Sequence, residues 1–406
     1  MMRLLLPLLL LGGLSSCAPD PSTASRAPAQ RTVSEIPTDR WAYVEVDSAK
    51  AMWGDFDDPE WLRYFGLAAG DLNGDGFADL VSGRNVYFSP GGNLSGKWRK
   101  ADLGRNVDAN LIYTPQAGRP FLLAEALPDV LRFNVGPDGK TDEGDVVARI
   151  PPTGHHNGQG YKIANLLKGN EADEIIYASQ GGLYVMDPTR PPPWPVTLVG
   201  KDASDEGLGV ADMDGDGDLD LISGYRSPGV DAEVPTVVVW FENPGVLDPS
   251  WSMHPVGTTI FATDRVEAAD LDGDGRADVV VAEERYPGLE PDANLWVFLQ
   301  KDTGFVRQKV VTQFSMNNLD VADLDRDGDL DLLTAEHKGP NLSLQVWLND
   351  GRANFTRQEI DRGKESHLGT RAVDMDGDGD LDIVSIGWDH HRYVHLWRND
   401  ALASEK

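Results

Sequence analysis

The chain lacks the features that mark several large classes of protein. Its 406 residues include one cysteine, so a disulfide within the monomer is excluded. Lys and Arg number 36 against 66 Asp and Glu, and the net charge of −30 comes without a basic stripe for phosphate contacts, which argues against nucleic-acid partners. The sequence has no Gly-x-Ser-x-Gly elbow, no Gly-rich phosphate loop and no zinc-binding His pair at helical spacing. Serine hydrolase, nucleotide-binding and zincin functions therefore lose support.

The acidic residues that are present concentrate in five similar segments of nine residues, which together hold 22 carboxylates. Each segment has Asp at position 1, Asp or Asn at position 3, Asp at positions 5 and 9, and Gly at position 6. The segments are Asp71-Leu-Asn-Gly-Asp-Gly-Phe-Ala-Asp79, Asp212-Met-Asp-Gly-Asp-Gly-Asp-Leu-Asp220, Asp270-Leu-Asp-Gly-Asp-Gly-Arg-Ala-Asp278, Asp323-Leu-Asp-Arg-Asp-Gly-Asp-Leu-Asp331 and Asp374-Met-Asp-Gly-Asp-Gly-Asp-Leu-Asp382.

This spacing predicts five calcium loops. Side-chain oxygens at positions 1, 3, 5 and 9, with a backbone carbonyl at position 7, supply the hard ligands that Ca²⁺ prefers, and Gly at position 6 permits a sharp turn. A run of Asp-Gly turns is the alternative, but a turn needs one Asp and one Gly, whereas here four or more oxygens return at fixed offsets. The flanks read as strands and no Glu stands at position 12, so these are not EF-hands. The predicted ligands are Asp71, Asn73, Asp75, Asp79, Asp212, Asp214, Asp216, Asp220, Asp270, Asp272, Asp274, Asp278, Asp323, Asp325, Asp327, Asp331, Asp374, Asp376, Asp378 and Asp382.

The spacing of the loops predicts seven repeated units. The last four loops follow one another at about 50 residues, a period typical of β-propellers, and the gap between Asp71 and Asp212 has room for two more units. One of these is visible as the degenerate segment 165–173, and the other falls near 119–123, where the acidic residues are lost.

The rest of each unit predicts an all-β fold of four-stranded blades. A short apolar strand follows each loop, then a strand such as Leu344-Gln-Val-Trp-Leu-Asn349, then one that begins with an aromatic residue. The last unit stops at 400 without this fourth strand, while an orphan strand, 41–46, precedes the first unit. We expect the N-terminal strand to complete the last blade, which leaves no free sheet edge where the chain ends meet.

With these loops, and with Phe65-Gly66 ahead of the first, residues 41–400 resemble the FG-GAP/VCBS repeats of integrin α-subunit head propellers and their bacterial relatives. The resemblance implies a seven-bladed propeller and about five Ca²⁺ ions. It carries the calcium role to the five intact loops only. Because propellers serve in adhesion, catalysis and scaffolding alike, the family does not imply an activity.

The first residues predict export and a lipid anchor. Residues 1–17 have a basic start, an apolar stretch too short to span a bilayer and Leu14-Ser-Ser-Cys17, which resembles a bacterial lipobox. An ordinary signal peptide with an incidental cysteine is the alternative. Residues 18–40 are rich in Pro, Ser and Ala and predict a flexible tether, and 401–406 form a tail. We therefore expect an extracytoplasmic protein on a bacterial membrane, at the outer membrane or cell surface, held by the lipid alone.

The face opposite the calcium loops is where the blades differ most. Loops after the second strands and between blades are expected on this face, and they carry six of the eight histidines, while His254 and His395 are placed in outer strands. The six are His155, His156, His337, His367, His390 and His391.

Two functions fit such a face. In the first, it is a recognition surface for an extracellular glycan or protein, with Tyr225, Arg226, Arg285, Tyr286 and Trp388 around a shallow funnel. In the second, histidines and a glutamate (Glu283, Glu284 or Glu336) hold a transition metal and act on a sugar, because imidazole suits such ions.

A partial similarity at 240–245 and 364–369 to the propellers of aldos-2-ulose dehydratase-type lyases favours the second function, although no cupin domain follows. Its catalytic candidates are His155, His337, His367 and Glu283. Solvated loop histidines are the alternative to both functions. Trp240, Trp347 and Trp397 are interpreted as packing residues at one repeated blade position. The binding module is preferred, and we expect a monomer.

Overall fold

A computed structural model describes residues 39–50, 65–153, 160–169, 172–226, 236–249, 251–285, 287–364, 369–387 and 392–401. The predicted signal peptide, Cys17 and almost all of the tether lie outside these ranges. The described residues form strands and no helix, so none of them belongs to a helix long and apolar enough to cross a membrane.

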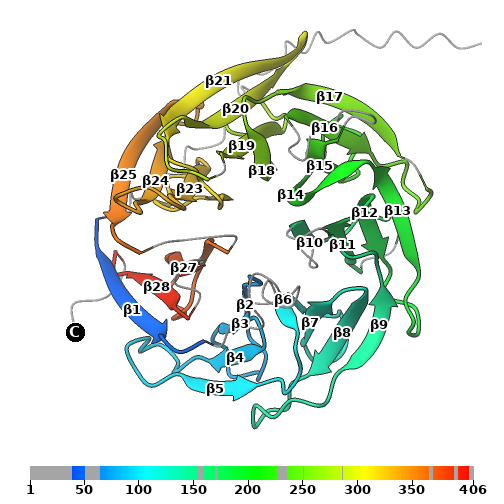
Figure 1. Cartoon of the computed structure of the whole chain (residues 1–406), viewed down its shortest axis with the longest axis vertical. Coiled ribbons are helices and arrows are strands. Elements are labelled where there is room, and N and C mark those ends of the chain that lie inside the picture. The colour runs from blue at the N-terminus through cyan, green and yellow to red at the C-terminus, as the bar shows by residue number, and fades with distance from the viewer. Residues whose placement is uncertain are drawn as a thin grey trace, which may run out of the picture. The chain divides into compact units, whose positions relative to one another are not determined.

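The strands form seven antiparallel sheets of four strands each, arranged as the blades of a ring (Figure 1). The first strands, which lie toward the centre, are β2 (Ala68–Gly70), β6 (Asp108–Tyr113), β10 (Gly160–Ala164), β14 (Ala203–Ala211), β18 (Ala262–Ala269), β22 (Asp320–Ala322) and β26 (Arg371–Val373). The second strands are β3 (Asp79–Ser82), β7 (Phe121–Ala126), β11 (Glu174–Ser179), β15 (Asp220–Tyr225), β19 (Asp278–Glu284), β23 (Asp331–Ala335) and β27 (Asp382–Ile386).

The third and fourth strands complete each blade toward the rim. The third strands are β4 (Asn85–Phe88), β8 (Asp129–Asn134), β12 (Gly182–Met186), β16 (Val237–Glu242), β20 (Ala293–Lys301), β24 (Leu344–Asn349) and β28 (Val394–Asn399). The fourth strands are β5 (Arg99–Asp102), β9 (Asp145–Arg149), β13 (Val196–Lys201), β17 (Ser252–Thr258), β21 (Gly304–Gln313), β25 (Phe355–Asp361) and β1 (Trp41–Asp47). The predicted fold, a seven-bladed propeller, is confirmed.

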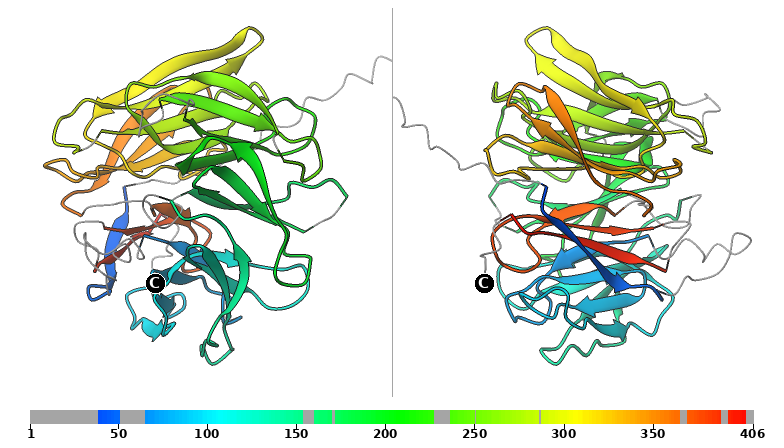
Figure 2. Two further views of the ribbon diagram at one scale, coloured as in Figure 1. Left: turned by 45° about the vertical axis from the view of Figure 1, so that its right-hand side comes forward. Right: turned by 90° about the vertical axis from the view of Figure 1, so that its left-hand side faces the viewer.

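The N-terminal strand closes the ring, as predicted. β1 pairs antiparallel with β28 from Trp41 opposite Asn399 to Asp47 opposite Val394, which makes it the fourth strand of the last blade (Figures 1 and 2). The Tyr43 hydroxyl lies 2.9 Å from His395 Nδ1, and Lys364 Nζ lies 4.2 Å from the centroid of the Tyr43 ring. The first and last strands of the propeller therefore stabilise each other directly.

Removal of residues 1–47 is expected to destabilise the propeller by several kcal/mol and to cause association, because β28 would become an unpaired edge with its backbone groups exposed. Removal of residues 1–38 keeps β1 and is the matched control. Size-exclusion chromatography and thermal melting of both truncations measure the effect. Equal melting temperatures and a monomeric 48–406 chain would contradict this account of closure.

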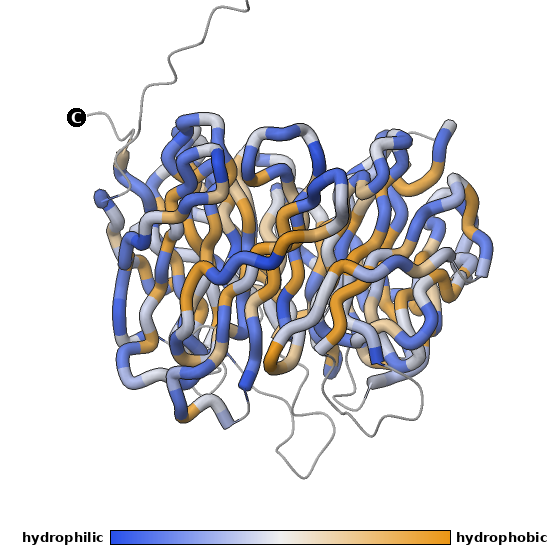
Figure 3. Tube along the Cα trace, turned by 90° about the horizontal axis from the view of Figure 1, so that it is seen from above, coloured by the Kyte–Doolittle hydropathy of each residue, from blue (hydrophilic) through white to orange (hydrophobic). Residues whose placement is uncertain are grey.

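The hydrophobic core lies between neighbouring blades. Between the third and fourth blades, for example, the buried residues Val185 and Val199 pack with Leu221 and Phe241. Burial of an aliphatic or aromatic side chain of this size stabilises the fold by about 1.5–3 kcal/mol. Hydropathy follows this arrangement, since hydrophobic positions lie along the strands and hydrophilic ones gather in the loops at the two faces (Figure 3).

The tryptophans predicted to share one blade position do not all share it. Trp347 pairs with Leu332 and Trp397 pairs with Ile383, each one residue after the last Asp of its loop. In the fourth blade Phe241 takes this position opposite Leu221, and Trp240 lies one residue earlier. Because successive side chains of a strand point to opposite faces, Trp240 packs toward the fifth blade instead of the third. All three are buried packing residues, but the repeat shifts by one residue at Trp240.

Candidate metal centres and the opposite face

The five acidic loops connect the first and second strands of their blades. The second loop, for instance, begins after β14 ends at Ala211 and ends where β15 begins at Asp220. The first strands of all blades run in the same direction, from one face of the propeller to the other, so the loops that follow them share one face, as predicted.

The aspartate at position 9 of each loop is a buried acceptor of two backbone hydrogen bonds. Asp220 is 2% exposed, and its Oδ2 accepts from Met213 N at 2.8 Å while its Oδ1 accepts from Asn243 N at 2.8 Å. The carboxylate thus joins the start of its own loop to the end of the third strand. The equivalent donor pairs are Leu72 and Ser89 to Asp79, Leu271 and Gln300 to Asp278, Leu324 and Asn349 to Asp331, and Met375 and Asn399 to Asp382.

The aspartate at position 1 orders the turn itself. Asp212 accepts hydrogen bonds from Gly215 N at 2.8 Å and from Gly217 N at 3.0 Å. Both glycines have positive φ, 80° and 91°, a backbone region that glycine adopts without steric cost. Arg326 takes the position of Gly215 in the loop 323–331 and keeps a positive φ of 59°.

Four of the loops bring carboxylates together in groups that can hold a metal ion. Within each group, oxygen atoms from positions 1, 3 and 9 all lie within 4.8 Å of one another, whereas the predicted ligand at position 5 is not part of the group. The groups are Asp212, Asp214 and Asp220; Asp270, Asp272 and Asp278; Asp323, Asp325 and Asp331; and Asp374, Asp376 and Asp382.

In two of these loops, buried oxygens without a hydrogen bond fit a cation. Asp323 Oδ1 and Asp272 Oδ1 are both buried and accept no hydrogen bond from the residues that the structure describes. Acceptor-only oxygens in such positions suit a hard divalent ion, and Ca²⁺ takes six to eight oxygen ligands.

Electrostatics supports the same conclusion. Burial, followed by the neighbouring carboxylates, raises the pKa of Asp382 to about 8 and that of Asp331 to about 7 despite the backbone hydrogen bonds that oppose the shift. For Asp79, Asp220 and Asp278 the same causes raise the pKa to about 6. A divalent cation among these groups would reverse the effect, because it favours the ionised carboxylates.

Without metal, the free energy of unfolding is expected to fall as pH rises from about 5 to 8. The folded protein holds protons on Asp382 and Asp331 that the unfolded chain, with an ordinary Asp pKa near 3.9, has released, so stability is present at low pH and lost through the folded pKa values. Melting curves of metal-stripped protein across this range, with and without added Ca²⁺, measure the effect. Stability that rises with pH in the stripped protein would contradict it.

Basic side chains already neutralise part of two loops. Lys301 forms ion pairs with Asp272 and with Asp274, the latter at 2.8 Å, and Arg276 lies 2.6 Å from Asp274. The hydrogen bond from Lys301 is the largest influence on Asp274 and helps to lower its pKa to about 2. Lys168 Nζ of the third blade lies 2.8 Å from Asp218 Oδ2 in the acidic loop of the fourth blade.

The degenerate loop of the third blade also has a buried carboxylate that accepts a backbone hydrogen bond from the start of the loop, but this loop is one residue longer. Leu166 N donates to Glu174 Oε2 at 2.8 Å, so Glu174 takes the place of the last Asp, which the sequence assigned to Asp173. Glu174 is fully buried. The longer side chain and the extra residue together restore the hydrogen bond that Asp accepts from the start of its loop.

Side-chain amides at the ends of third strands link the acidic loops of neighbouring blades. Asn243 Nδ2 donates at 2.6 Å to the carbonyl of Leu166 in the preceding blade, and Asn349 Nδ2 donates at 2.8 Å to that of Leu271. Gln300 makes the same bond to Met213. The acidic loops are therefore tied into the interfaces between blades, and their order bears on the stability of the ring.

The opposite face is only partly described. His155, His156, His367, His390 and His391, with Tyr286 and Trp388, lie outside the described residues, and their convergence stays a prediction. His337 follows β23, is 3% exposed, and its backbone N donates to Ser315 O at 2.8 Å. Glu336 beside it is also buried and accepts from Ser343 N at 3.2 Å.

Glu283 has a structural role. It is fully buried within β19, and Oε1 accepts hydrogen bonds from Ile260 N at 2.6 Å, Phe261 N at 3.2 Å and Trp296 Nε1 at 2.7 Å. Oε2 accepts from Asn294 N at 2.9 Å and from Asn294 Nδ2 at 2.6 Å. A carboxylate with five donors holds the fifth blade together and has no exposed oxygen for a substrate, contrary to its predicted place among the catalytic candidates.

The two remaining histidines differ from each other. His254 lies in the fourth strand β17, stacks on Trp240 with ring centroids 4.3 Å apart, and its Nε2 lies 2.8 Å from Glu242 Oε2. His395 lies in the third strand β28, toward the rim as predicted, and is 4% exposed. Its pairing with β1 buries it.

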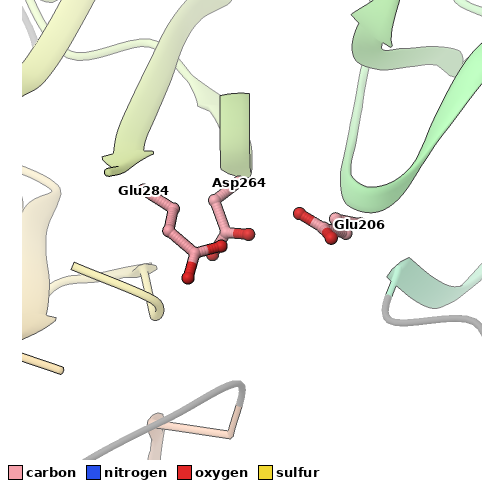
Figure 4. A group of neighbouring side chains, drawn as sticks. All are labelled: Glu206, Asp264 and Glu284. Carbon is pink, nitrogen blue, oxygen red and sulfur yellow. The ribbon is translucent and has the colours of Figure 1, made fainter. Parts of the chain in front are cut away.

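A further acidic group lies where the first strands of the fourth and fifth blades approach each other. Oxygens of Glu206 on β14, Asp264 on β18 and Glu284 at the end of β19 lie within 4.8 Å of one another (Figure 4). Burial raises the pKa of Asp264 well above its usual range; Arg265 opposes this shift, while Glu284 and Glu206 add to it. The sequence pattern indicated no role for Glu206 or Asp264.

Comparison with protein-family models gave two matches. A model described as an FG-GAP-like repeat matches residues 212–281 and 323–385, and one described as an FG-GAP repeat matches residues 64–95. Together these ranges contain all five acidic loops. A search of curated proteins found no match.

Solved structures share the fold at low identity. BBS1N, solved in complex with ARL6DN, has a TM-score of 0.56 at 12% identity, with 89% of this chain and 98% of that chain covered. A lectin of Agrocybe aegerita, solved for its specific recognition of non-reducing terminal N-acetylglucosamine, has a TM-score of 0.49 at 19% identity, with 74% of this chain and 81% of that chain covered. The first likeness supports the propeller fold and nothing beyond it.

Proposed function

The chain is an FG-GAP repeat propeller, and from this premise we propose that it is a calcium-stabilised binding module held outside the cytoplasm by a lipid anchor. The observation that carries the proposal is the repeated loop geometry: in four loops the carboxylates at positions 1, 3 and 9 converge within 4.8 Å. In the first loop, Asn73 supplies an amide oxygen at position 3. Calcium is the ion proposed because every donor in these groups is an oxygen.

The anchor is proposed from the lipobox-like Leu14-Ser-Ser-Cys17. Cys17 would carry the lipid, and the residues up to about 40 would separate the propeller from the membrane. Expression in a bacterium fed a radiolabelled or alkyne fatty acid tests this part: the chain should be labelled, and Cys17→Ala should abolish the label. Labelling that survives Cys17→Ala would overturn the anchor.

The binding surface is proposed on the face opposite the acidic loops, because there the loop sequences differ between blades, as recognition requires. Tyr225 ends the second strand of the fourth blade on this face and Arg226 follows it, and Arg285 follows the second strand of the fifth blade. An extracellular glycan or protein is the expected ligand, and no nucleic acid or further membrane contact is expected.

Glycan arrays and pull-downs from extracellular extracts, both in Ca²⁺, test the binding function. A ligand found in this way should bind Arg285→Ala at least about 10-fold more weakly, because loss of a charged contact costs more than about 1.4 kcal/mol. Arg352→Ala is the control, since Arg352 is exposed in the loop between β24 and β25 on the other face. A ligand sensitive to Arg352→Ala and not to Arg285→Ala would place recognition on the acidic-loop face instead.

We do not propose the carbohydrate lyase. Of its three glutamate candidates, the one predicted to be catalytic, Glu283, has all of its described contacts within the fold. No other observation on the described residues favours catalysis over binding.

A further inference from the structure

The group formed by Glu206, Asp264 and Glu284 lies on two irregular strands. In β18 the pairing shifts between Thr263 and Arg265, which leaves Asp264 as the extra residue of a β-bulge. In β14 the pairing shifts between Ala203 and Leu208, a stretch that includes Glu206. Bulges redirect side chains and are frequent next to functional sites. Here they direct carboxylates from two blades toward one another (Figure 4).

Asp264 has the most buried carboxylate of the group. Its side chain is 1% exposed, and neither Oδ1 nor Oδ2 accepts a hydrogen bond from the described residues. A buried carboxylate in this state is costly unless a charge partner completes it. Glu267, on the same strand, shows the usual solution, because Lys162 Nζ lies 2.5 and 2.8 Å from its two oxygens.

The guanidinium group of Arg265 compensates the charge of Asp264 only in part. Arg265 Nη2 lies 3.3 Å from Asp264 Oδ2, but the hydrogen bonds of Arg265 go to the backbone carbonyls of Asn317, at 3.0 Å, and of Asp264, at 2.6 Å. Arg226 is paired with Asp205. Among the described residues, the positive charge beside Asp264 is therefore the guanidinium of Arg265, whose hydrogen bonds go to backbone carbonyls.

We propose that Glu206, Asp264 and Glu284 bind a divalent cation of the oxygen-preferring kind, such as Ca²⁺, as a site separate from the five acidic loops. Three carboxylates supply three to six oxygen ligands, and the group contains no histidine or cysteine, which favours Ca²⁺, Mg²⁺ or Mn²⁺ over Zn²⁺ or Cu²⁺.

The position of this site follows from the topology. Glu206 and Asp264 lie near the starts of first strands, and Glu284 ends a second strand, so the group lies toward the face opposite the acidic loops. First strands line the centre of the ring, which places the proposed ion near its axis. The site is independent of the proposed ligand and of calcium in the loops.

Calcium binding to the purified chain and to two variants tests the proposal, with Ca²⁺ alone as the probe. Asp264→Asn and Glu284→Gln should each bind one fewer Ca²⁺ per chain than the wild type by native mass spectrometry, or bind that ion more than about 10-fold more weakly by calorimetry. Glu290→Gln, which removes an exposed carboxylate from the loop after β19, is the matched control and should bind as the wild type does.

Unchanged stoichiometry and affinity in both variants would overturn the site. If Asp264→Asn does not fold, Glu284→Gln alone decides, because Glu284 is only half-buried. A wild-type chain that binds a single Ca²⁺, lost in both variants, would support this site while contradicting calcium in the acidic loops.

Discussion

Removal of calcium is expected to lower the melting temperature of the propeller by more than about 10 °C. An ion that binds only the folded chain at 100 times its dissociation constant adds about 2.7 kcal/mol, and five such ions add on the order of 10 kcal/mol. The acidic loops are also tied to neighbouring blades, for example by Asn349 and Asn243, so their disorder would weaken the interfaces. Differential scanning calorimetry in excess Ca²⁺ and in excess chelator measures the shift.

A loop variant makes this result specific. Replacement of both Asp374 and Asp376 by Ala removes two ligands of the last loop and keeps Asp382, which holds the backbone. The calcium-dependent part of the melting shift should then fall by roughly a fifth, since one of five predicted ions is lost. An identical melting curve with and without chelator would contradict calcium binding by the loops.

Replacement of Glu283 is expected to have the second largest effect, a loss of about 3–5 kcal/mol in the free energy of unfolding for Glu283→Gln. The carboxylate accepts five hydrogen bonds, and the amide group of Gln would turn a donor toward either the Oε1 or the Oε2 set of donors. At least two buried N–H groups would then lose their acceptor. Denaturant unfolding measures the change.

Glu290→Gln serves as the control for charge removal, because Glu290 is exposed in the loop that follows the same strand. It should change stability by less than about 0.5 kcal/mol. If Glu283→Gln is as stable as this control, the carboxylate is not a structural hub, and its predicted place in a catalytic site would have to be considered again.

The fold could be predicted from the sequence because each repeat has a recognisable local pattern. The acidic loops recur along the chain at a nearly constant period, and each lies between two short apolar strands. The orphan strand that includes Trp41 and the missing strand after Asn399 could be matched from order alone. Closure by β1 and the placement of the acidic loops between first and second strands are both confirmed.

What the sequence missed depends on contacts between distant residues. Glu283 stands in an acidic run that reads as a solvated loop, but its donors come from residues 260, 261, 294 and 296, on other strands and turns. The meeting of Glu206 with Asp264 requires two bulges and the approach of two blades. A β-bulge of this kind does not change the composition or the repeat period of the sequence, so it could not be predicted from them.

Smaller errors have a common cause in the strand period of two residues. A shift of one residue places Trp240 on the other side of its sheet. One added residue in the third blade makes Glu174, instead of Asp173, the acceptor of the backbone hydrogen bond from the loop. A repeat pattern in the sequence looks the same after a shift of one residue, whereas the backbone pairing changes. Only the observed strand register shows which residue occupies each position.

The most direct test of the account is the number of calcium ions per chain, measured by elemental analysis of protein purified without its first 17 residues. The account predicts about six in the wild type, five from the acidic loops and one from the group at Asp264, about five in Asp264→Asn, and one fewer than wild type in the Asp374→Ala, Asp376→Ala variant. A wild-type chain that retains no calcium at millimolar free Ca²⁺ would contradict it.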